Sequence, residues 1–261
     1  MDKRKIIYFE DELNDEFSTA VIPPRRIDET YVYRKDSPFK KFTHFFWYRI
    51  VATPIAFFYT KIAHRHKIVG KSALRKFKKS GYFLYGNHTH ALGDSVIPSM
   101  LTLPKDAYVI VHPSNVSIPY IRRVATSLGA LPLPDTLGAY KNFISAVESR
   151  YNDGCAVVIY PEAHIWPYYT KIRPFKDDSF HYPVKLGAPV FCFTNTYQKR
   201  RFGKKPKTVT YVDGPFFPNK ELSPTEQRAD LRNRVYERMC ERAENSNVVV
   251  IEYKRKEKEN G

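Results

Sequence analysis

The sequence predicts a single α/β domain with a mostly parallel central sheet flanked by helices, preceded by an aromatic helical segment. From residue 66 onward, short apolar runs alternate with longer amphipathic ones, as expected where helices connect parallel strands. The length of 261 residues allows one sizeable core and does not demand a second domain. We therefore divide the chain into residues 1–62, an arm with an amphipathic membrane-docking segment, and residues 63–261, the α/β domain.

The first part of the chain differs from the rest in composition. Residues 1–40 are polar, mixed in charge and interrupted by prolines, which indicates an arm that lies on another part of the structure and is not a core element. Residues 42–60 are the most aromatic stretch, but Arg49 and Pro54 interrupt an apolar run already too short to cross a bilayer. With the basic run Lys61–Lys67 behind it, this segment is suited to a membrane interface. An ordinary buried helix is the alternative interpretation.

The α/β domain contains clear candidates for its strands and helices. The expected strands are His66–Val69, Tyr82–Tyr85, Ala107–Val111, Ala156–Tyr160, Pro189–Thr194 and Thr208–Val212. The expected helices are Ser72–Lys79, Ser95–Leu101, Pro119–Ser127, Leu137–Asn152 and Ser179–Leu186.

The last expected helix has the strongest start signal. Ser223, Pro224 and Glu226 supply an N-cap hydroxyl, a proline at the first helical position and a glutamate at N3, so a helix should run from here to about Glu244. The basic tail beginning at Lys254 is expected to be a solvated end.

Charge and cysteine content narrow the class of protein. The 43 Lys and Arg against 27 Asp and Glu give a net charge of +16, which predicts an acidic partner: nucleic acid, an anionic lipid surface or a phosphate-rich donor such as coenzyme A. The 3 cysteines are far apart and lack C-x-x-C spacing, so neither disulfides nor a metal site are expected. The N-terminus lacks the pattern of a secretion signal, and a reducing cytosolic setting fits best.

Ionisable residues follow two of the expected strands, in the segments Gly86–Asp94 and Tyr160–His164. The segment Gly86–Asp94 comes directly after a strand, where α/β domains present reactive groups. A histidine next to an aspartate is the minimum equipment of a general base. His90 lies four residues before Asp94, on the same face of a helix, whereas His88 could reach Asp94 only across a turn that Gly93 would ease. Spacing alone slightly favours His90.

Four sequence blocks between about residues 64 and 195 occur in a recognisable order. They are Asn87-His88 followed by an aspartate, an IPxxRxxxxxLGA segment at Ile118–Ala130, Tyr160-Pro161-Glu162, and Gly187-Ala188-Pro189-Val190. In this order they resemble the glycerolipid acyltransferase family typified by 1-acylglycerol-3-phosphate acyltransferases. The aromatic segment before them is similar to the membrane-docking helices of that family.

The resemblance implies a reaction and assigns roles to residues. His88, chosen over His90, would be the catalytic base that deprotonates the acceptor hydroxyl, and Asp94 would orient its imidazole. The hydroxyl would attack an acyl thioester carried by coenzyme A or acyl carrier protein, and no cofactor is implied. Asn87 or backbone N–H groups could stabilise the oxyanion. Glu162, with Pro161, would help to bind the acceptor.

The chain departs from the family pattern in ways that bear mainly on the acceptor. Five residues separate His88 from Asp94 where the family has four, so a catalytically silent relative that docks on membranes is an alternative. The family's Pro-Glu-Gly-Thr-Arg becomes Pro-Glu-Ala-His-Ile, and Asp135 lies where the family has a phosphate-binding arginine. The available substitutes for that arginine are Lys141, Arg173 and Lys176.

These observations predict a peripheral or monotopic enzyme of phospholipid biosynthesis on the cytoplasmic face of the membrane. Its partners would be an anionic membrane surface, an acyl thioester donor, a lysolipid such as lysophosphatidic acid and, in one version, acyl carrier protein. Another hydroxylated lipid or a glycolipid is a close alternative as acceptor. A basic nucleic-acid-binding protein is the rival from another class, but the chain contains no recognised nucleic-acid-binding module.

Overall fold

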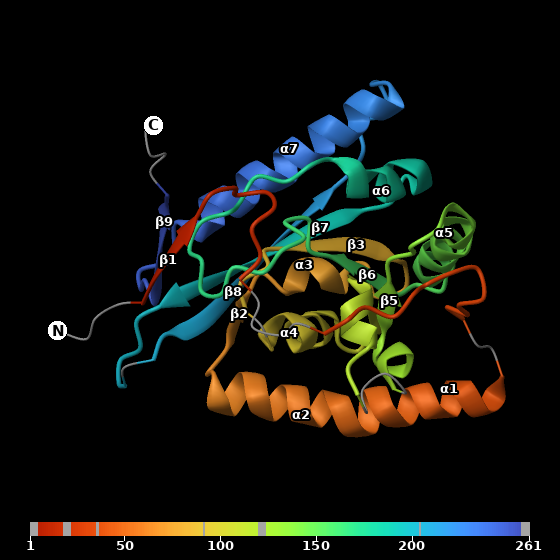
Figure 1. Ribbon diagram of the computed structural model, residues 1–261, viewed down its shortest axis with the longest axis horizontal. Helices are drawn as coiled ribbons and strands as arrows, with labels where there is room; N and C mark the ends of the chain where they lie inside the picture. The colour runs from red at the N-terminus through yellow and green to blue at the C-terminus, as the bar shows by residue number, and fades with distance from the viewer. Residues whose placement is uncertain are drawn as a thin grey trace.

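The centre of the computed structural model is a mixed sheet of seven strands within the residues that the structure describes, 5–17, 22–34, 37–90, 92–119, 124–203 and 205–256 (Figure 1). In sheet order the strands are β2 (Lys67–Val69), β8 (Lys207–Phe216), β7 (Val190–Gln198), β3 (Tyr82–Gly86), β6 (Ala156–Ile159), β4 (Ala107–Val111) and β5 (Ala130–Pro132). The strands from β7 to β5 are mutually parallel, and β8 runs antiparallel to β7 with β2 parallel to β8. The predicted fold class is confirmed.

Helices cover both faces of this sheet, which explains why its central strands are apolar along their whole length. One face carries α5 (Leu137–Asn152), α6 (His181–Leu186) and α7 (Pro224–Ala243), and their apolar residues form the larger core cluster with β3, β6 and β7. The other face carries α3 (Ser72–Arg75) and α4 (Gly93–Thr102), which pack on a second cluster.

Local signals placed some elements accurately and others less so. The helix α7 begins with the predicted capping box, in which Ser223 accepts from the N–H of Glu226 and the Glu226 carboxylate accepts from the N–H of Ser223. Strands β7 and β8 are longer than expected because they pair with each other as an antiparallel hairpin. The helix expected at Pro119–Ser127 falls partly outside the described residues. Within them, Ala125–Leu128 forms a 3₁₀ turn.

The two ends of the described chain pair with each other, which the sequence analysis did not anticipate. Strand β1 (Lys5–Phe9) runs parallel to β9 (Ile251–Arg255) in a separate two-stranded sheet. Ile27, from the same N-terminal region, is 0% exposed and belongs to the main core. The expectation that residues 1–40 contain no core element was therefore wrong. Lys254, Arg255 and Lys256 are exposed as expected, although the first two belong to a paired strand. The expected boundary between residues 62 and 63 is crossed by this core.

A long helix precedes the sheet. It comprises α1 (Pro38–Phe45), a π-helical stretch (Phe46–Ala52), α2 (Thr53–Phe57) and a second π-helical stretch (Phe58–Ala63), and it lies against α4 and the turn at Ala125–Leu128 (Figure 1). Among the residues that the structure describes, none of the helices combines the length and the apolarity needed to span a membrane.

This helix has a buried side and an exposed apolar side. Tyr48 is buried, its hydroxyl accepts from the N–H of Ala107 at 2.9 Å, and Arg49 pairs with Asp106, so the helix is anchored at the start of β4. Ten large apolar side chains of the same helix are exposed: Phe39, Phe42, Phe45, Phe46, Trp47, Ile50, Ile55, Phe57, Phe58 and Ile62.

Candidate active site

The candidate site lies at the edge of the sheet where the parallel strands end. β3 ends at Gly86, and the loop that follows carries His88 before α4 begins at Gly93. The neighbouring strand β6 ends just before Tyr160 and Glu162. The topology thus brings the two predicted groups of ionisable residues to one place.

His88 and Asp94 form a hydrogen-bonded pair. The Nδ1 of His88 lies 2.8 Å from Oδ2 of Asp94, and because a carboxylate only accepts, the imidazole donates through Nδ1–H. The lone pair of the neutral ring is then on Nε2, which makes no hydrogen bond to any residue that the structure describes. The His88 side chain is 24% exposed and that of Asp94 only 3%, so solvent or substrate can meet the imidazole but not its carboxylate.

The loop accommodates the longer His-to-Asp interval by a tight turn at His90. The N–H of His90 donates to Oδ2 of Asp94 at 2.9 Å, and the N–H of Asp94 donates to the carbonyl of His90 at 2.7 Å. The ring of His90 accepts through Nδ1 from the N–H of Gly93, and a Cβ on Gly93 would lie 2.5 Å from that ring. Burial lowers the pKa of His90. Asp94 is therefore paired with the ring of His88 and with the main chain of His90.

Tyr160 fixes both members of the pair from one side. Its ring stacks on the imidazole of His88 with centroids 4.7 Å apart, and its hydroxyl donates to the carbonyl of Asp94 at 2.6 Å. Burial, together with the nearby Asp94 carboxylate, raises the pKa of Tyr160, so the phenol stays protonated and acts as a donor.

Glu162 contacts the backbone of the candidate base. One carboxylate oxygen accepts from the N–H of His88 at 3.0 Å and the other from the N–H of Arg173, also at 3.0 Å. Burial raises the pKa of Glu162, although the Arg173 guanidinium and these two N–H donors favour its ionised form. At 3% exposure, Glu162 supports the loop from behind.

Arg173 is buried, and both terminal nitrogens of its guanidinium already have hydrogen-bond partners, whereas its Nε has none among the described residues. At 1% exposure, it faces the Glu162 carboxylate at 3.5 Å and donates to the main-chain carbonyls of Glu162, His164 and Glu12. Its guanidinium also lies over the ring of Trp166, 4.9 Å from the centroid. The structure therefore gives Arg173 a supporting position, and the phosphate-binding role expected from the sequence stays a prediction.

The other predicted site residues make no comparable contacts with the His88–Asp94 pair, which we call the dyad. Asn87 is 1% exposed and its amide is committed to β7: it accepts from the N–H of Asn195 at 2.7 Å and donates to the carbonyl of Asn195 at 3.1 Å. Pro161 is half-buried beyond the end of β6. Lys141 and Lys176 are exposed, and within the described ranges no hydrogen bond or ion pair links either of them to the dyad.

The residue after Glu162 occupies a conformation that glycine prefers. Ala163 has a φ of 61°, in the left-handed region that is unfavourable for residues with a Cβ. The chain thus has an alanine where the resemblance implied a glycine, and the backbone there is in the left-handed region.

The loop after Glu162 joins the small sheet to the dyad loop. The N–H groups of Trp166 and Tyr168 donate to the carbonyls of His88 and Thr89 at 3.1 and 2.8 Å. The indole of Trp166 packs on Phe9 of β1 and stacks on Tyr253 of β9 with centroids 4.9 Å apart. Strands near the two ends of the chain therefore hold the loop that holds His88.

Sequence analysis missed a buried polar residue behind the dyad. Asn195 lies in β7 at 2% exposure and its Nδ2 donates to Oδ1 of Asp94 at 3.3 Å. The available signal was the polar triplet Thr194-Asn195-Thr196 inside a strand that is otherwise buried. Polar side chains at such buried positions need hydrogen-bond partners, so the triplet itself indicates a polar contact inside the domain.

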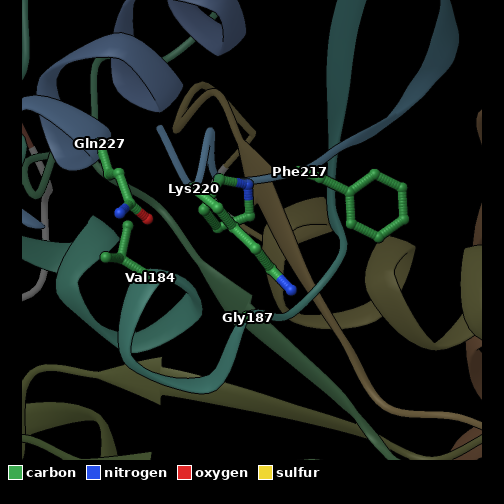
Figure 2. A pocket seen from close by; sticks show the side chains of 6 residues that line it. Val184, Gly187, Phe217, Lys220 and Gln227 are labelled. Carbon is green, nitrogen blue, oxygen red and sulfur yellow. The ribbon is translucent and has the colours of Figure 1, made fainter. Parts of the chain in front are cut away.

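A separate pocket of about 350 Å³ lies at the opposite edge of the sheet, where β7 begins. Figure 2 shows the side chains around it, with Lys220 extending across. Its lining consists of Val184, Gly187, Phe217, Pro218, Lys220 and Gln227, and includes none of the predicted site residues.

Comparisons with known proteins bear on this site. The family model described as Acyltransferase matches residues 65–194, the region that contains both reactive loops. The crystal structure of the 1-acyl-sn-glycerophosphate (LPA) acyltransferase, PlsC, from Thermotoga maritima is similar in fold, with a TM-score of 0.53 and 20% sequence identity over 72% of this chain and 78% of that one. No curated protein sequence matches the chain.

Proposed function

The chain belongs to the acyltransferase family, and from this premise we propose that it moves a fatty acyl group from acyl-CoA or acyl carrier protein to a hydroxyl of a lysophospholipid. The observation that carries the proposal is the pairing of His88 Nδ1 with Asp94 at 2.8 Å, because it leaves Nε2 of the partly exposed imidazole to act as a base. The resemblance of the sequence blocks points to the same chemistry.

The reaction needs one proton carrier and no covalent enzyme intermediate. The acceptor hydroxyl gives its proton to Nε2 of His88 as its oxygen attacks the thioester carbonyl, forming the C–O bond. When the tetrahedral intermediate collapses, the C–S bond breaks and the thiolate takes the proton back from the imidazolium. Asp94 stabilises that imidazolium through Nδ1. Because the Asn87 amide is committed to Asn195, oxyanion stabilisation falls to main-chain N–H groups.

A lysophospholipid such as lysophosphatidic acid is our first choice of acceptor. The structurally similar PlsC is a 1-acyl-sn-glycerophosphate acyltransferase, and the excess of cations in this chain favours an anionic substrate. A non-phosphorylated lipid or a glycolipid is the second candidate. It is favoured by the burial of Arg173, whose terminal nitrogens already have partners, and by Asp135, whose carboxylate accepts from the N–H of Ile27 at 2.6 Å.

The long N-terminal helix is proposed to seat the enzyme on an anionic membrane at its cytoplasmic face. Its exposed apolar side chains follow helical spacing, for example Phe42, Phe46 and Ile50, and Lys40 and Lys41 beside them are exposed as well. Exposed apolar clusters of this kind on a surface helix favour insertion at the headgroup boundary. A lipid acceptor would then reach His88 without leaving the membrane surface.

A donor and acceptor screen tests the proposal. Release of free thiol from palmitoyl-CoA would be followed with lysophosphatidic acid, uncharged monoacylglycerol and a glycolipid in parallel. The measurements would then be repeated with palmitoyl-acyl carrier protein as the donor. Turnover with at least one pair, abolished by His88→Ala, is the expected result. The absence of turnover with every pair would contradict the proposal, and the preferred acceptor decides between the two candidates.

A further inference from the structure

Behind the dyad, a chain of hydrogen bonds crosses three strands. Asn195 of β7 donates through Nδ2 to Oδ1 of Asp94 at 3.3 Å, and its Oδ1 accepts from the hydroxyl of Thr210 in β8 at 2.6 Å. The Thr210 hydroxyl lies 2.6 Å from Nε2 of His66, the residue just before β2. All four side chains are buried, from 0% to 4% exposed.

The hydrogen bonds from His66 through Thr210 and Asn195 to Asp94 can be donated in one direction only. The Thr210 hydroxyl has a single proton, and since Oδ1 of Asn195 can only accept, the hydroxyl gives its proton there and accepts from Nε2–H of His66. Burial keeps His66 neutral by lowering its pKa to about 3. A rotated Asn195 amide would turn its oxygen toward the Asp94 carboxylate and its NH₂ group toward Thr210, so this rotation is disfavoured.

The sheet register holds the same residues in place through the backbone. Asn195 pairs with Thr210 across β7 and β8, and Thr210 pairs with Ile68 of β2. The main chain of Asn195 is also clasped by the Asn87 amide, one residue before His88. Asn195 thus contacts the dyad loop at two points, its side chain at Asp94 and its backbone at Asn87.

We propose that Asn195 is a positioning residue for the dyad, with its amide oriented by Thr210 and His66, an inference that rests on the proposed acyltransferase function. Its Nδ2–H holds one oxygen of Asp94 so that the other receives Nδ1–H of His88. The base is thereby fixed in the tautomer whose Nε2 carries the lone pair. Asn195 does not touch the reacting atoms and acts through Asp94.

The first arm of the test measures steady-state kinetics with palmitoyl-CoA and the acceptor that turns over best. Thr210→Val should lower kcat roughly 10-fold with KM changed less than about 3-fold, because the amide is free to rotate, and Thr210→Ser should restore most of the rate. Thr194→Val is the matched control: Thr194 is 0% exposed, precedes Asn195 in the same strand, and its hydroxyl has no hydrogen-bond partner among the residues described.

The pH profile of Asn195→Asp gives a readout that a merely structural role would not move. Two carboxyls beside each other hold one proton between them, and while they do, the new residue can still donate to Asp94. As the pH rises, this proton is lost and the two carboxylates repel each other. Asn195→Asp should therefore gain an alkaline limb in kcat that is absent from the wild type and from Thr194→Val. An unchanged profile would overturn the assignment.

A spectroscopic arm separates this inference from the proposed function. The ¹⁵N-coupled ring proton of His88, identified by its loss in His88→Gln, should report Nδ1–H bound to a carboxylate in the wild type and in Thr194→Val. In Thr210→Val this signal should broaden or disappear through faster exchange. An unaltered signal would refute the role of Asn195 even in an active enzyme. A wild type without thioester turnover would instead refute the proposed function, while the spectrum would still show whether Asn195 positions the dyad.

Discussion

The backbone N–H of His88 donates to the carboxylate of Glu162 at 3.0 Å, so the loop that carries the candidate base is tied to the loop beyond the neighbouring strand. Glu162 is in turn paired with the buried Arg173. The residue pattern that resembles a substrate-binding motif is therefore also part of the support of the dyad, and variants can separate the two roles.

Replacing His88 tests the choice of base. His88→Ala should lower kcat by at least about 100-fold without unfolding the protein, since a positioned general base contributes roughly 10²- to 10⁴-fold. His90→Ala should retain most of the activity, because the His90 ring only accepts a hydrogen bond from the N–H of Gly93. The contact of His90 with Asp94 is made by its backbone N–H, which alanine keeps. The exposed His112 is a matched control for histidine removal. If His90→Ala were as inactive as His88→Ala while still folded, our assignment would have to be reversed.

Breaking the buried ion pair should destabilise the fold. Glu162→Ala leaves the Arg173 guanidinium buried without its carboxylate, which is expected to cost about 3–5 kcal/mol in the free energy of unfolding. Glu162→Gln keeps the shape and an acceptor for one N–H, so its loss should be smaller. Urea unfolding of both variants measures the difference. Equal stability of Glu162→Ala and the wild type would show that the pair does not support the loop.

Restoring glycine beyond Glu162 should stabilise the protein. Ala163 is held at a φ of 61°, where a Cβ costs roughly 1–2 kcal/mol, and Ala163→Gly removes that cost while giving back part of it as unfolded-state entropy. We expect a net gain of about 0.5–1 kcal/mol in urea unfolding. A loss of stability would mean that the Cβ makes contacts that compensate for the backbone strain.

Acid should weaken the fold through buried neutral histidines. The pKa of His66 is lowered to about 3 by burial, and burial also lowers the pKa values of His64 and His90. Below about pH 6.5 the unfolded chain binds protons that the folded chain refuses, so the unfolding free energy should fall by up to about 1.4 kcal/mol per pH unit for His66 alone. This loss should level off near the folded pKa.

The control for this pH dependence is a residue that cannot titrate. His66→Gln retains a donor for Thr210 and should show a shallower decline in urea midpoint between about pH 6 and pH 4, although its stability at neutral pH is itself lower. Parallel curves for the wild type and His66→Gln would exclude His66 as the source.

Membrane binding should depend on the exposed aromatic row. Phe42 and Phe46 stack at 6.5 Å on the exposed side of the helix, and Phe42→Ser combined with Phe46→Ser should weaken binding to phosphatidylglycerol vesicles at least about tenfold. The control exchanges two exposed leucines elsewhere, Leu133 and Leu137, for serine. Vesicle co-sedimentation measures both. Equal binding of the two double variants would place the membrane contact elsewhere.

Local signals were sufficient for much of the fold. The start of α7 after its N-cap Ser223 and the buried strands β3 and β6 were predictable. Capping residues and continuous apolar runs are local signals that a few neighbouring residues contain in full. The pairing of β1 with β9 was not predictable, since strand partners so distant in sequence leave no mark on either segment. Spacing alone also slightly favoured His90, because it could not show that Asp94 would accept from the main chain of that residue.

The hydrogen bonds that link Asn195, Thr210 and His66 behind the dyad could not be predicted from sequence motifs, for a similar reason. Asn195 lies in β7, Thr210 in β8 and His66 just before β2, and these segments meet only in the folded sheet. Each is an unremarkable polar residue in its own segment, and only their register makes them neighbours.

The pairing of β1 with β9 sets an order of events during synthesis. Residues 5–9 leave the ribosome long before residues 251–255, yet the Trp166 loop beneath His88 rests on both strands. A nascent chain can therefore assemble its main sheet early and still lack firm support beneath the His88 loop until residues 251–255 have been made. A chain that ends just before β9 should keep its main core but lose the contacts of Tyr253 with the loop beneath His88.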